Sequence, residues 1–181
     1  TPPPASQPAS TPTTPPAAKP ATKPADTATK PAVPSPVEQV AKTSIASLYF
    51  IRVDDDGTIR RQEVKRSISS SDVPLTDAVK ALLEGPTVDE LGRKLISLIP
   101  SGTRLLHAQV RGSTVYLDFS EDFMFNNYGI EGYAGQLAQI VYTATSFAAV
   151  KDVQILIEGQ KRDYLAGDGI YIGKPLSRSS L

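Results

Sequence analysis

The sequence predicts an α+β domain in which helices pack on one face of a mixed or antiparallel sheet, preceded by a disordered proline-rich tail. Three observations predict this fold. Residues 1–36 hold 12 of the 16 prolines and no glycine or aromatic residue. Between residues 47 and 172, several short segments alternate apolar and polar side chains as strands do. Two longer segments repeat apolar residues at helical spacing instead, and the resulting mixture of strands and helices is typical of α+β domains.

The composition excludes several functional classes. The 181 residues include 19 basic and 19 acidic side chains, so the net charge is zero, and there is one histidine and no cysteine. A neutral chain lacks the basic excess of proteins that bind nucleic acids, so no nucleic-acid partner is expected. Without cysteine there is no disulfide framework or cysteine-ligated zinc, and one histidine excludes a multi-histidine metal site.

The tail is predicted from its amino acids. Residues 1–44 are rich in Pro, Ala, Thr, Ser and Lys, a composition that buries too little apolar surface to fold. Such a segment extends as polyproline II, at about 3.1 Å per residue. It suits either an ordinary interdomain linker or a spacer behind a missing N-terminal membrane anchor or export signal, and we favour the spacer. Residues 45–176 are the predicted domain, and 177–181 a flexible C-terminus.

The folded part is predicted to begin with a hairpin. Residues 47–53 contain aromatic and β-branched side chains, which favour a strand. An Asp-Gly pair at 56–57 is a strong turn signal. Residues 58–66 alternate, but both of their faces are largely polar. We therefore expect an exposed edge strand that returns beside the first strand.

The first predicted helix has clear limits. Asp72 can cap its amino end, and Pro74 fits the first turn, where no backbone donor is needed. Gly85 and Pro86 are residues that commonly end a helix. Between these limits, one face of the helix collects the apolar residues Leu75, Ala78, Val79, Leu82 and Leu83.

A second, shorter helix is predicted over residues 88–96. Thr87 and Glu90 have the spacing of a capping box, in which each side chain bonds the backbone of the other residue. Residues 99–103 read Ile-Pro-Ser-Gly-Thr, a turn sequence. The chain should therefore reverse direction here before it enters the next strand.

The remaining strands follow from alternation. Residues 104–110 and 114–119 are predicted to pair across a turn at 111–113, and 152–157 and 170–172 to add two more strands. The side chains expected on one face of the first of these strands are Leu106, Ala108 and Val110. Those expected to point inward from the next two are Val115, Leu117, Phe119, Val153, Ile155 and Ile157.

No catalytic, cofactor or metal site is predicted. The acidic run at 54–56 resembles a fragment of a calcium loop, but it lacks the later ligands and is better read as a solvated turn. His107 has no nucleophile motif to serve. Asp118 and the pair Glu121 and Asp122 suit backbone capping better than glycoside hydrolysis.

A long helix predicted over residues 131–149 differs from ordinary surface helices. Its apolar stripe comprises Tyr133, Leu137, Ile140, Val141, Ala144 and Ala148, and residues 132–150 include no charged side chain. An uncharged polar side indicates either burial under other elements or a face that contacts another protein, because interface cores are depleted in charge. We take the second interpretation as a hypothesis. The candidate interaction face comprises Gln136, Gln139, Thr143 and Ser146.

Read in order, these segments resemble the GerMN domain family of sporulation and spore-germination proteins. The resemblance covers about residues 46–175, and each motif gains specificity from its order and spacing. It implies a single non-enzymatic α+β domain, similar in fold to the ring-building motif of sporulation channel proteins. The matching segments are residues 48–50, Glu63 with the basic residues after it, and residues 81–86, 99–103, 115–120, 131–147 and 153–159.

The resemblance also implies a function. Members of this family lie outside the cytoplasmic membrane, often behind a lipoprotein or transmembrane anchor. We therefore expect an envelope-anchored binding or assembly module in the periplasm or cell-wall space, tethered to the membrane only through its N-terminal anchor. Its partner would be an envelope or cell-wall protein, or a second copy of the chain. The alternative is a module that binds peptidoglycan or regulates an amidase, while an enzyme is disfavoured because the sequence lacks metal ligands and a nucleophile.

Overall fold

The computed structural model describes residues 42–56, 58–165 and 169–181. The predicted tail therefore lies, up to residue 41, outside the described residues. The first strand begins at Thr43, close to the predicted start of the domain. In the described part of the chain, no helix is both long and apolar enough to cross a membrane.

The predicted hairpin is confirmed and is longer than expected. β1 (Thr43–Val53) and β2 (Ile59–Ser69) pair antiparallel along their whole length. A short strand, β3 (Leu95–Ile96), pairs with the turn end of β1, so the strand order is β2-β1-β3. One face of the hairpin is apolar and points into the core through Ala46, Leu48, Phe50, Val64 and Ile68.

A second sheet holds three of the later strands. β4 (Leu105–Arg111) and β5 (Thr114–Phe119) pair antiparallel, while β6 (Asp152–Ile157) joins β5 in parallel. Parallel neighbours need a long crossover, and α3 (Gly129–Ala144) lies in the segment that provides it. β7 (Tyr164–Leu165) and β8 (Ile170–Tyr171) form a small ribbon. The predicted α+β class is confirmed, with the strands divided among several sheets.

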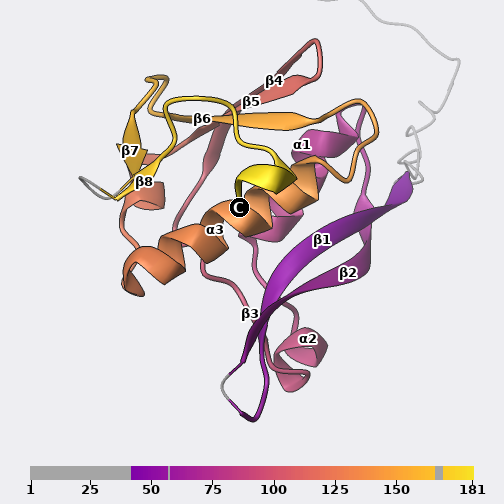
Figure 1. Ribbon diagram of the computed structural model, residues 1–181. Helices are drawn as coiled ribbons and strands as arrows, with labels where there is room; N and C mark the ends of the chain where they lie inside the picture. The colour runs from indigo at the N-terminus through magenta and orange to yellow at the C-terminus, as the bar shows by residue number, and fades with distance from the viewer. Residues whose placement is uncertain (1–41, 57, 166–168) are drawn as a thin grey trace, which may run out of the picture. The chain divides into compact units, whose positions relative to one another are not determined.

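The helices connect the two larger sheets. α1 (Pro74–Leu83) and α3 both contact β1 and each other, and Figure 1 shows α3 crossing between the hairpin and the β4-β5-β6 sheet. α2 (Val88–Gly92) sits beside β3. Two short 3₁₀ helices, η1 (Glu121–Met124) and η2 (Arg178–Ser180), complete the described structure. α3 is thus the central element, surrounded by neighbours on several sides.

The predicted stripe of α1 is confirmed as part of the core. Leu75, Ala78, Val79 and Leu82 are buried, and Leu82 is completely inaccessible to solvent. Leu83, the next residue, is only half-buried and packs at the margin of the same core. The two neighbouring leucines therefore differ in how much packing each of them supplies.

We expect Leu82→Ala to lower the free energy of unfolding by about 2–5 kcal/mol, because it removes a fully buried side chain and leaves a cavity. Leu83→Ala is the matched control and should cost less than half as much, since its side chain already contacts solvent. Urea denaturation followed by circular dichroism measures both values. Equal losses for the two variants would contradict this placement of the helix.

The helix ends differ from the prediction in two places. Val73, not Asp72, occupies the cap position of α1, and no side chain bonds to the backbone there. Asp77 instead accepts hydrogen bonds from the backbone N–H and hydroxyl of Ser71, at 2.7 and 2.8 Å. α2 ends at Gly92 rather than near residue 96, because the backbone of Lys94 turns to a φ of 63° and the chain then pairs with β1 as β3.

Two further elements differ from simple periodic patterns. Leu106 and Val110, predicted to share one face of β4 with Ala108, are exposed at 44% and 48%, whereas Ala108 is half-buried against the core. A register shift between Leu105 and His107 changes the alternation there. The central helix ends at Ala144 instead of residue 149, and Ala148 is exposed in the turns that follow.

The segment predicted to be flexible at the C-terminus makes defined contacts. Arg178 donates hydrogen bonds from Nε to the Thr145 hydroxyl, at 2.8 Å, and from Nη2 to the Tyr142 carbonyl, at 3.1 Å. Its guanidinium also lies 4.8 Å from the centre of the Tyr142 ring. These contacts hold η2 against the end of α3.

Candidate functional site

The residues considered for chemistry are engaged in structural contacts. In the acidic turn, Asp54 pairs with Arg52 and Arg60, and Asp55 pairs with Lys94. Asp56 accepts a hydrogen bond from the backbone of Thr58 at 2.9 Å, and bonds from Thr58 lower the pKa of Asp56. These are the contacts of a hairpin turn, not of an open calcium loop.

Of the other acidic candidates, Asp118 and Asp122 also bond within the protein, while the side chain of Glu121 is exposed. Asp118 lies across from the exposed His107 in the β4–β5 register, but it accepts a hydrogen bond from the backbone N–H of Gly159 at 2.8 Å. Asp122 accepts one from the hydroxyl of Ser120 at 2.9 Å. Among the residues that the structure describes, no three potential metal ligands come together.

The candidate interaction face on α3 is wrong for most of its residues. Gln136, Gln139 and Thr143 are completely buried, and only Ser146 is exposed. The amide of Gln136 donates to the Phe123 carbonyl at 2.7 Å. This face therefore points into the domain, and the burial interpretation of the uncharged helix is the correct one.

Each buried polar group on this face bonds to a neighbouring segment. The amide oxygen of Gln139 accepts from the backbone N–H of Leu98 at 2.7 Å. The hydroxyl of Thr143 accepts from the backbone N–H of Tyr49 at 3.1 Å, on the edge of β1 that faces α3. Buried N–H groups need hydrogen-bond acceptors. These uncharged side chains provide acceptors for the backbone N–H groups of Leu98 and Tyr49.

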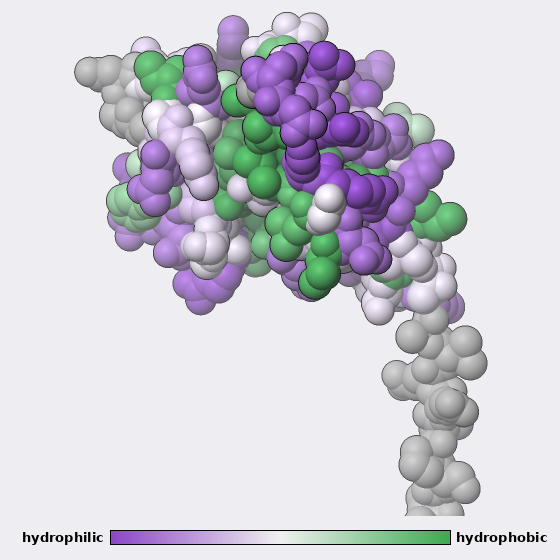
Figure 2. Space-filling view, turned by 90° about the horizontal axis from the view of Figure 1, so that it is seen from below, coloured by the Kyte–Doolittle hydropathy of each residue, from purple (hydrophilic) through white to green (hydrophobic). Residues whose placement is uncertain are grey.

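A groove lies between the turn end of the hairpin, β3 and the first half of α3. It has a volume of about 930 Å³ and a mainly apolar lining. In the view from below (Figure 2), apolar side chains gather in a band bordered by hydrophilic ones. We call this hollow the apolar groove; its lining comprises Ile51, Val53, Ile59, Arg60, Arg61, Ile96, Leu98, Tyr128, Glu131, Gly132, Ala134, Gly135, Ala138 and Leu181.

Small residues of α3 shape this groove. A Cβ atom on Gly135 would lie 2.4 Å from Cδ1 of Leu98, so only glycine lets the Leu98 side chain pack against the helix here. The short side chain of Ala134 is exposed and projects little from the adjacent surface of the helix. Ile59 stands opposite on β2 with 57% of its surface exposed. The result is a hollow with an apolar wall that remains in contact with water.

Basic side chains border the apolar groove on the β2 side. The guanidinium of Arg61 lies 4.1 Å from the centre of the Tyr142 ring, and among the described residues it forms no ion pair. Arg60 pairs with Asp54 at 3.2 Å in an exposed position, where such pairs contribute little. This border is therefore positively charged.

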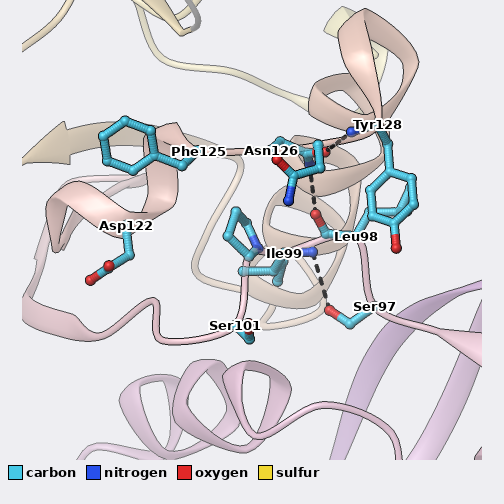
Figure 3. A pocket seen from close by; sticks show the side chains of 10 residues that line it. Ser97, Leu98, Ile99, Ser101, Asp122, Phe125, Asn126 and Tyr128 are labelled. Atoms are coloured by element: carbon cyan, nitrogen blue, oxygen red, sulfur yellow. Dashed lines mark hydrogen bonds between the residues drawn. The ribbon is translucent and has the colours of Figure 1, made fainter.

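A second hollow adjoins the first at Leu98 and Tyr128. It has a volume of about 370 Å³ and lies between the loop 97–101 and the segment 125–128, next to Asp122. Figure 3 shows Phe125 and Tyr128 on opposite sides of it, with Leu98 and Ile99 between them. We call this hollow the polar pocket; its lining comprises Ser97, Leu98, Ile99, Pro100, Ser101, Asp122, Phe125, Asn126, Asn127 and Tyr128.

Of the residues that line these hollows, only Asp122 was a candidate for chemistry in the sequence, and residues 99–101 were expected only as part of a turn. One signal was available: residues 123–130 hold three aromatic side chains and form no long regular element, and such aromatics need a partner. The apolar groove had no comparable signal, because it combines residues from β1, β2 and α3 that are far apart in the sequence. Only the fold brings them together.

The fold defines a small α+β domain with two hollows on its surface. A family model described as Germane, sporulation and spore germination, matches residues 47–163. The chain therefore belongs to this family, and the resemblance to GerMN domains is confirmed. Among curated proteins, none matches the sequence.

Three solved structures share the fold. The first GerMN domain of the sporulation protein GerM from Bacillus subtilis is 23% identical, with a TM-score of 0.60 over 75% of this chain and 98% of that one. The tandem GerMN domains of the same protein are 20% identical, with a TM-score of 0.62 over 80% of this chain and 49% of that one. The chain therefore spans about half their length. A Clostridium perfringens protein described as a putative lipoprotein is 21% identical, with a TM-score of 0.54 over 77% of this chain and 91% of that one.

Proposed function

We propose that this chain is a non-catalytic docking module of an extracytoplasmic sporulation or germination machinery, and that it binds an envelope or cell-wall protein. The apolar groove is the observation that carries the proposal. A periplasmic or cell-wall location, with a tether to the cytoplasmic membrane, is supported by family membership and by the fold shared with GerM and with a protein described as a lipoprotein.

The groove has the chemistry of a protein-binding surface. Ile59 is 57% exposed, and Val53 and Ile96 are half-buried beside it. A continuous apolar surface in water is characteristic of sites that a partner covers, and charge is depleted at the centre of such interfaces while the rim stays polar. Here the centre is apolar, Arg60 and Arg61 form the rim on β2, and Glu131 of α3 is the one acidic side chain of the lining.

The two arginines of that rim support an acidic partner. An apolar segment with acidic side chains on one side would cover the groove and bring a carboxylate close to Arg61, whose guanidinium has no carboxylate partner in the described structure. A carboxylate at a guanidinium forms a charge-assisted hydrogen bond, which is stronger than a neutral one. The proposed occupant is therefore an acidic, apolar segment of an envelope protein.

The proposal is tested by photocrosslinking in cells that produce the full-length protein. A photoreactive residue in place of Ile59, inside the groove, is expected to crosslink to one envelope protein. The same residue in place of Ile45, which is 76% exposed on the same strand pair but outside the groove, is the control and should not. Ala134→Glu should abolish the crosslink, because it fills the groove and adds a negative charge that repels an acidic partner.

Two outcomes would contradict this docking function. One is the absence of any crosslink from position 59, and the other is the same set of crosslinked proteins from positions 59 and 45. Ala134 is exposed on α3, and glutamate is a good helix former, so Ala134→Glu should stay folded. Its thermal unfolding curve, compared with that of the unchanged protein, confirms that a lost crosslink reports on the groove.

A further inference from the structure

The polar pocket has a lining suited to an uncharged ligand. Its side chains offer hydroxyl groups from two serines and a tyrosine, the amide group of Asn127 and one carboxylate from Asp122, while the amide of Asn126 bonds within the protein. None of the ten described residues that line it is lysine or arginine. Phosphate and carboxylate ligands are normally held by such cations, and the negative charge of Asp122 repels them. The pocket therefore favours a neutral ligand rich in hydrogen-bonding groups.

Two aromatic rings flank this lining and face water. Phe125 is 62% exposed and Tyr128 is 66% exposed. Within the described chain, neither ring takes part in a ring–ring or guanidinium–ring contact. Figure 3 places them on opposite sides of the pocket. Exposed rings of this kind offer flat apolar surfaces to a ligand that has an apolar face of its own.

The frame that carries the rings is held by hydrogen bonds. The amide nitrogen of Asn126 donates to the Leu98 carbonyl at 2.7 Å and to the buried Gln136 at 2.9 Å, which ties the two walls to α3. The amide oxygen of Asn126 accepts from the backbone N–H of Tyr128 at 2.8 Å. A site held in place before binding loses less entropy when it takes its ligand.

We propose that the polar pocket binds a neutral oligosaccharide of pyranose units. A pyranose ring has an apolar face of C–H groups and a rim of hydroxyl groups, and this combination matches the two kinds of group in the pocket. The C–H face would lie on the ring of Phe125 or Tyr128, and the hydroxyls would bond to Ser101 and Asn127. The volume of about 370 Å³ is in the range of small-ligand sites. This site goes beyond the proposed protein docking, which uses the apolar groove.

The test is an NMR titration of the isotope-labelled full chain with two neutral sugars, chitotetraose and cellotetraose, and one anionic sugar, tetragalacturonate. We expect saturable shifts of backbone amides in 97–101 and 125–128 with at least one neutral sugar below about 10 mM, and none with the anionic one. Comparison of the two neutral sugars shows whether the acetamido group of chitotetraose or the shared pyranose ring is recognised.

Variants locate the binding. Phe125→Ala should weaken it by at least about tenfold, because it removes one stacking surface. Ile130→Ala is the matched control: its side chain is 70% exposed nearby but lines neither hollow, so affinity should not change. Ala134→Glu, which blocks the apolar groove, should also leave sugar binding unchanged, and this separates the two sites.

Three results would overturn the proposal. They are the absence of saturable shifts with both neutral sugars up to about 10 mM, equal affinity of Phe125→Ala and the unchanged protein, and tighter binding of tetragalacturonate than of either neutral sugar. Because Phe125 is exposed, its replacement should not unfold the domain, and the spectrum of the variant without sugar verifies this directly.

Discussion

Replacing Arg66 with alanine is expected to lower the free energy of unfolding by about 3–5 kcal/mol, because it leaves a buried carboxylate without its partner. Arg66 of β2 forms an ion pair with Glu90 of α2, which is only 3% exposed. Its Nη1 and Nη2 also donate to the carbonyls of Ala81 and Gly85, at 3.1 Å each. One side chain thus joins the hairpin to the end of α1 and to α2.

The acid partner is itself fixed by the capping box predicted from the sequence. The Glu90 carboxylate accepts from the backbone N–H of Thr87 at 2.8 Å, and the Thr87 hydroxyl accepts from that of Glu90 at 3.4 Å. Removing Arg66 therefore cannot free Glu90 to reach solvent without breaking the cap of α2 as well. Urea denaturation of Arg66→Ala measures the loss. Arg52→Ala, which breaks an exposed pair with Asp54, should cost less than about 1 kcal/mol.

The loss should also depend on pH in a defined direction. Burial alone raises the pKa of Glu90, but hydrogen bonds from Arg66 and Thr87 outweigh it, so the pKa lies below its ordinary value. Stabilisation by an acid with a lowered pKa is complete above the pKa of the unfolded chain and is lost as pH falls through the folded value. The difference between the unchanged protein and Arg66→Ala should therefore shrink below about pH 4. A difference that stays constant from pH 7 to pH 3 would contradict the role of this ion pair.

Local sequence signals predicted the helices and strands correctly where tertiary packing favours the same secondary structure. The Thr87–Glu90 capping box, the paired strands of the hairpin and the apolar stripe of α1 are all present in the structure. They could be predicted because each rests on interactions between residues close in the sequence. The end of α2 could not, since it depends on a distant partner: residues 95 and 96 leave the helix to pair with β1.

The candidate site was harder to predict for the same reason. Uncharged side chains at helical spacing on α3 were compatible with burial and with an interface, and sequence alone could not choose between them. The choice depends on whether neighbouring backbone N–H groups lack acceptors, as those of Tyr49 and Leu98 do without α3. A helix without charged residues that carries amide and hydroxyl side chains at regular spacing should first be interpreted as buried. This interpretation fails only if no neighbouring segment can form hydrogen bonds with those side chains.

Replacing both Gln139 and Thr143 with glutamate is expected to lower the free energy of unfolding by about 4 kcal/mol or more, and to leave the chain largely unfolded near neutral pH. Both positions have no solvent exposure. A carboxylate at position 143 would add volume and charge where the hydroxyl accepts one hydrogen bond from Tyr49. At position 139 an acid could still accept from Leu98, but only by losing hydration for which no cation compensates.

The fourth residue of the same face provides the control. Ser146 is exposed just beyond the end of α3, and its hydroxyl donates to the Thr143 carbonyl at 2.7 Å. Ser146→Glu should therefore change stability by less than about 1 kcal/mol, mainly through an unfavourable charge near the helix C-terminus. Circular dichroism and dispersion of the amide NMR signals measure all three substitutions. A folded double variant as stable as Ser146→Glu would mean that this face of α3 is open to solvent, and would restore it as a surface for a partner.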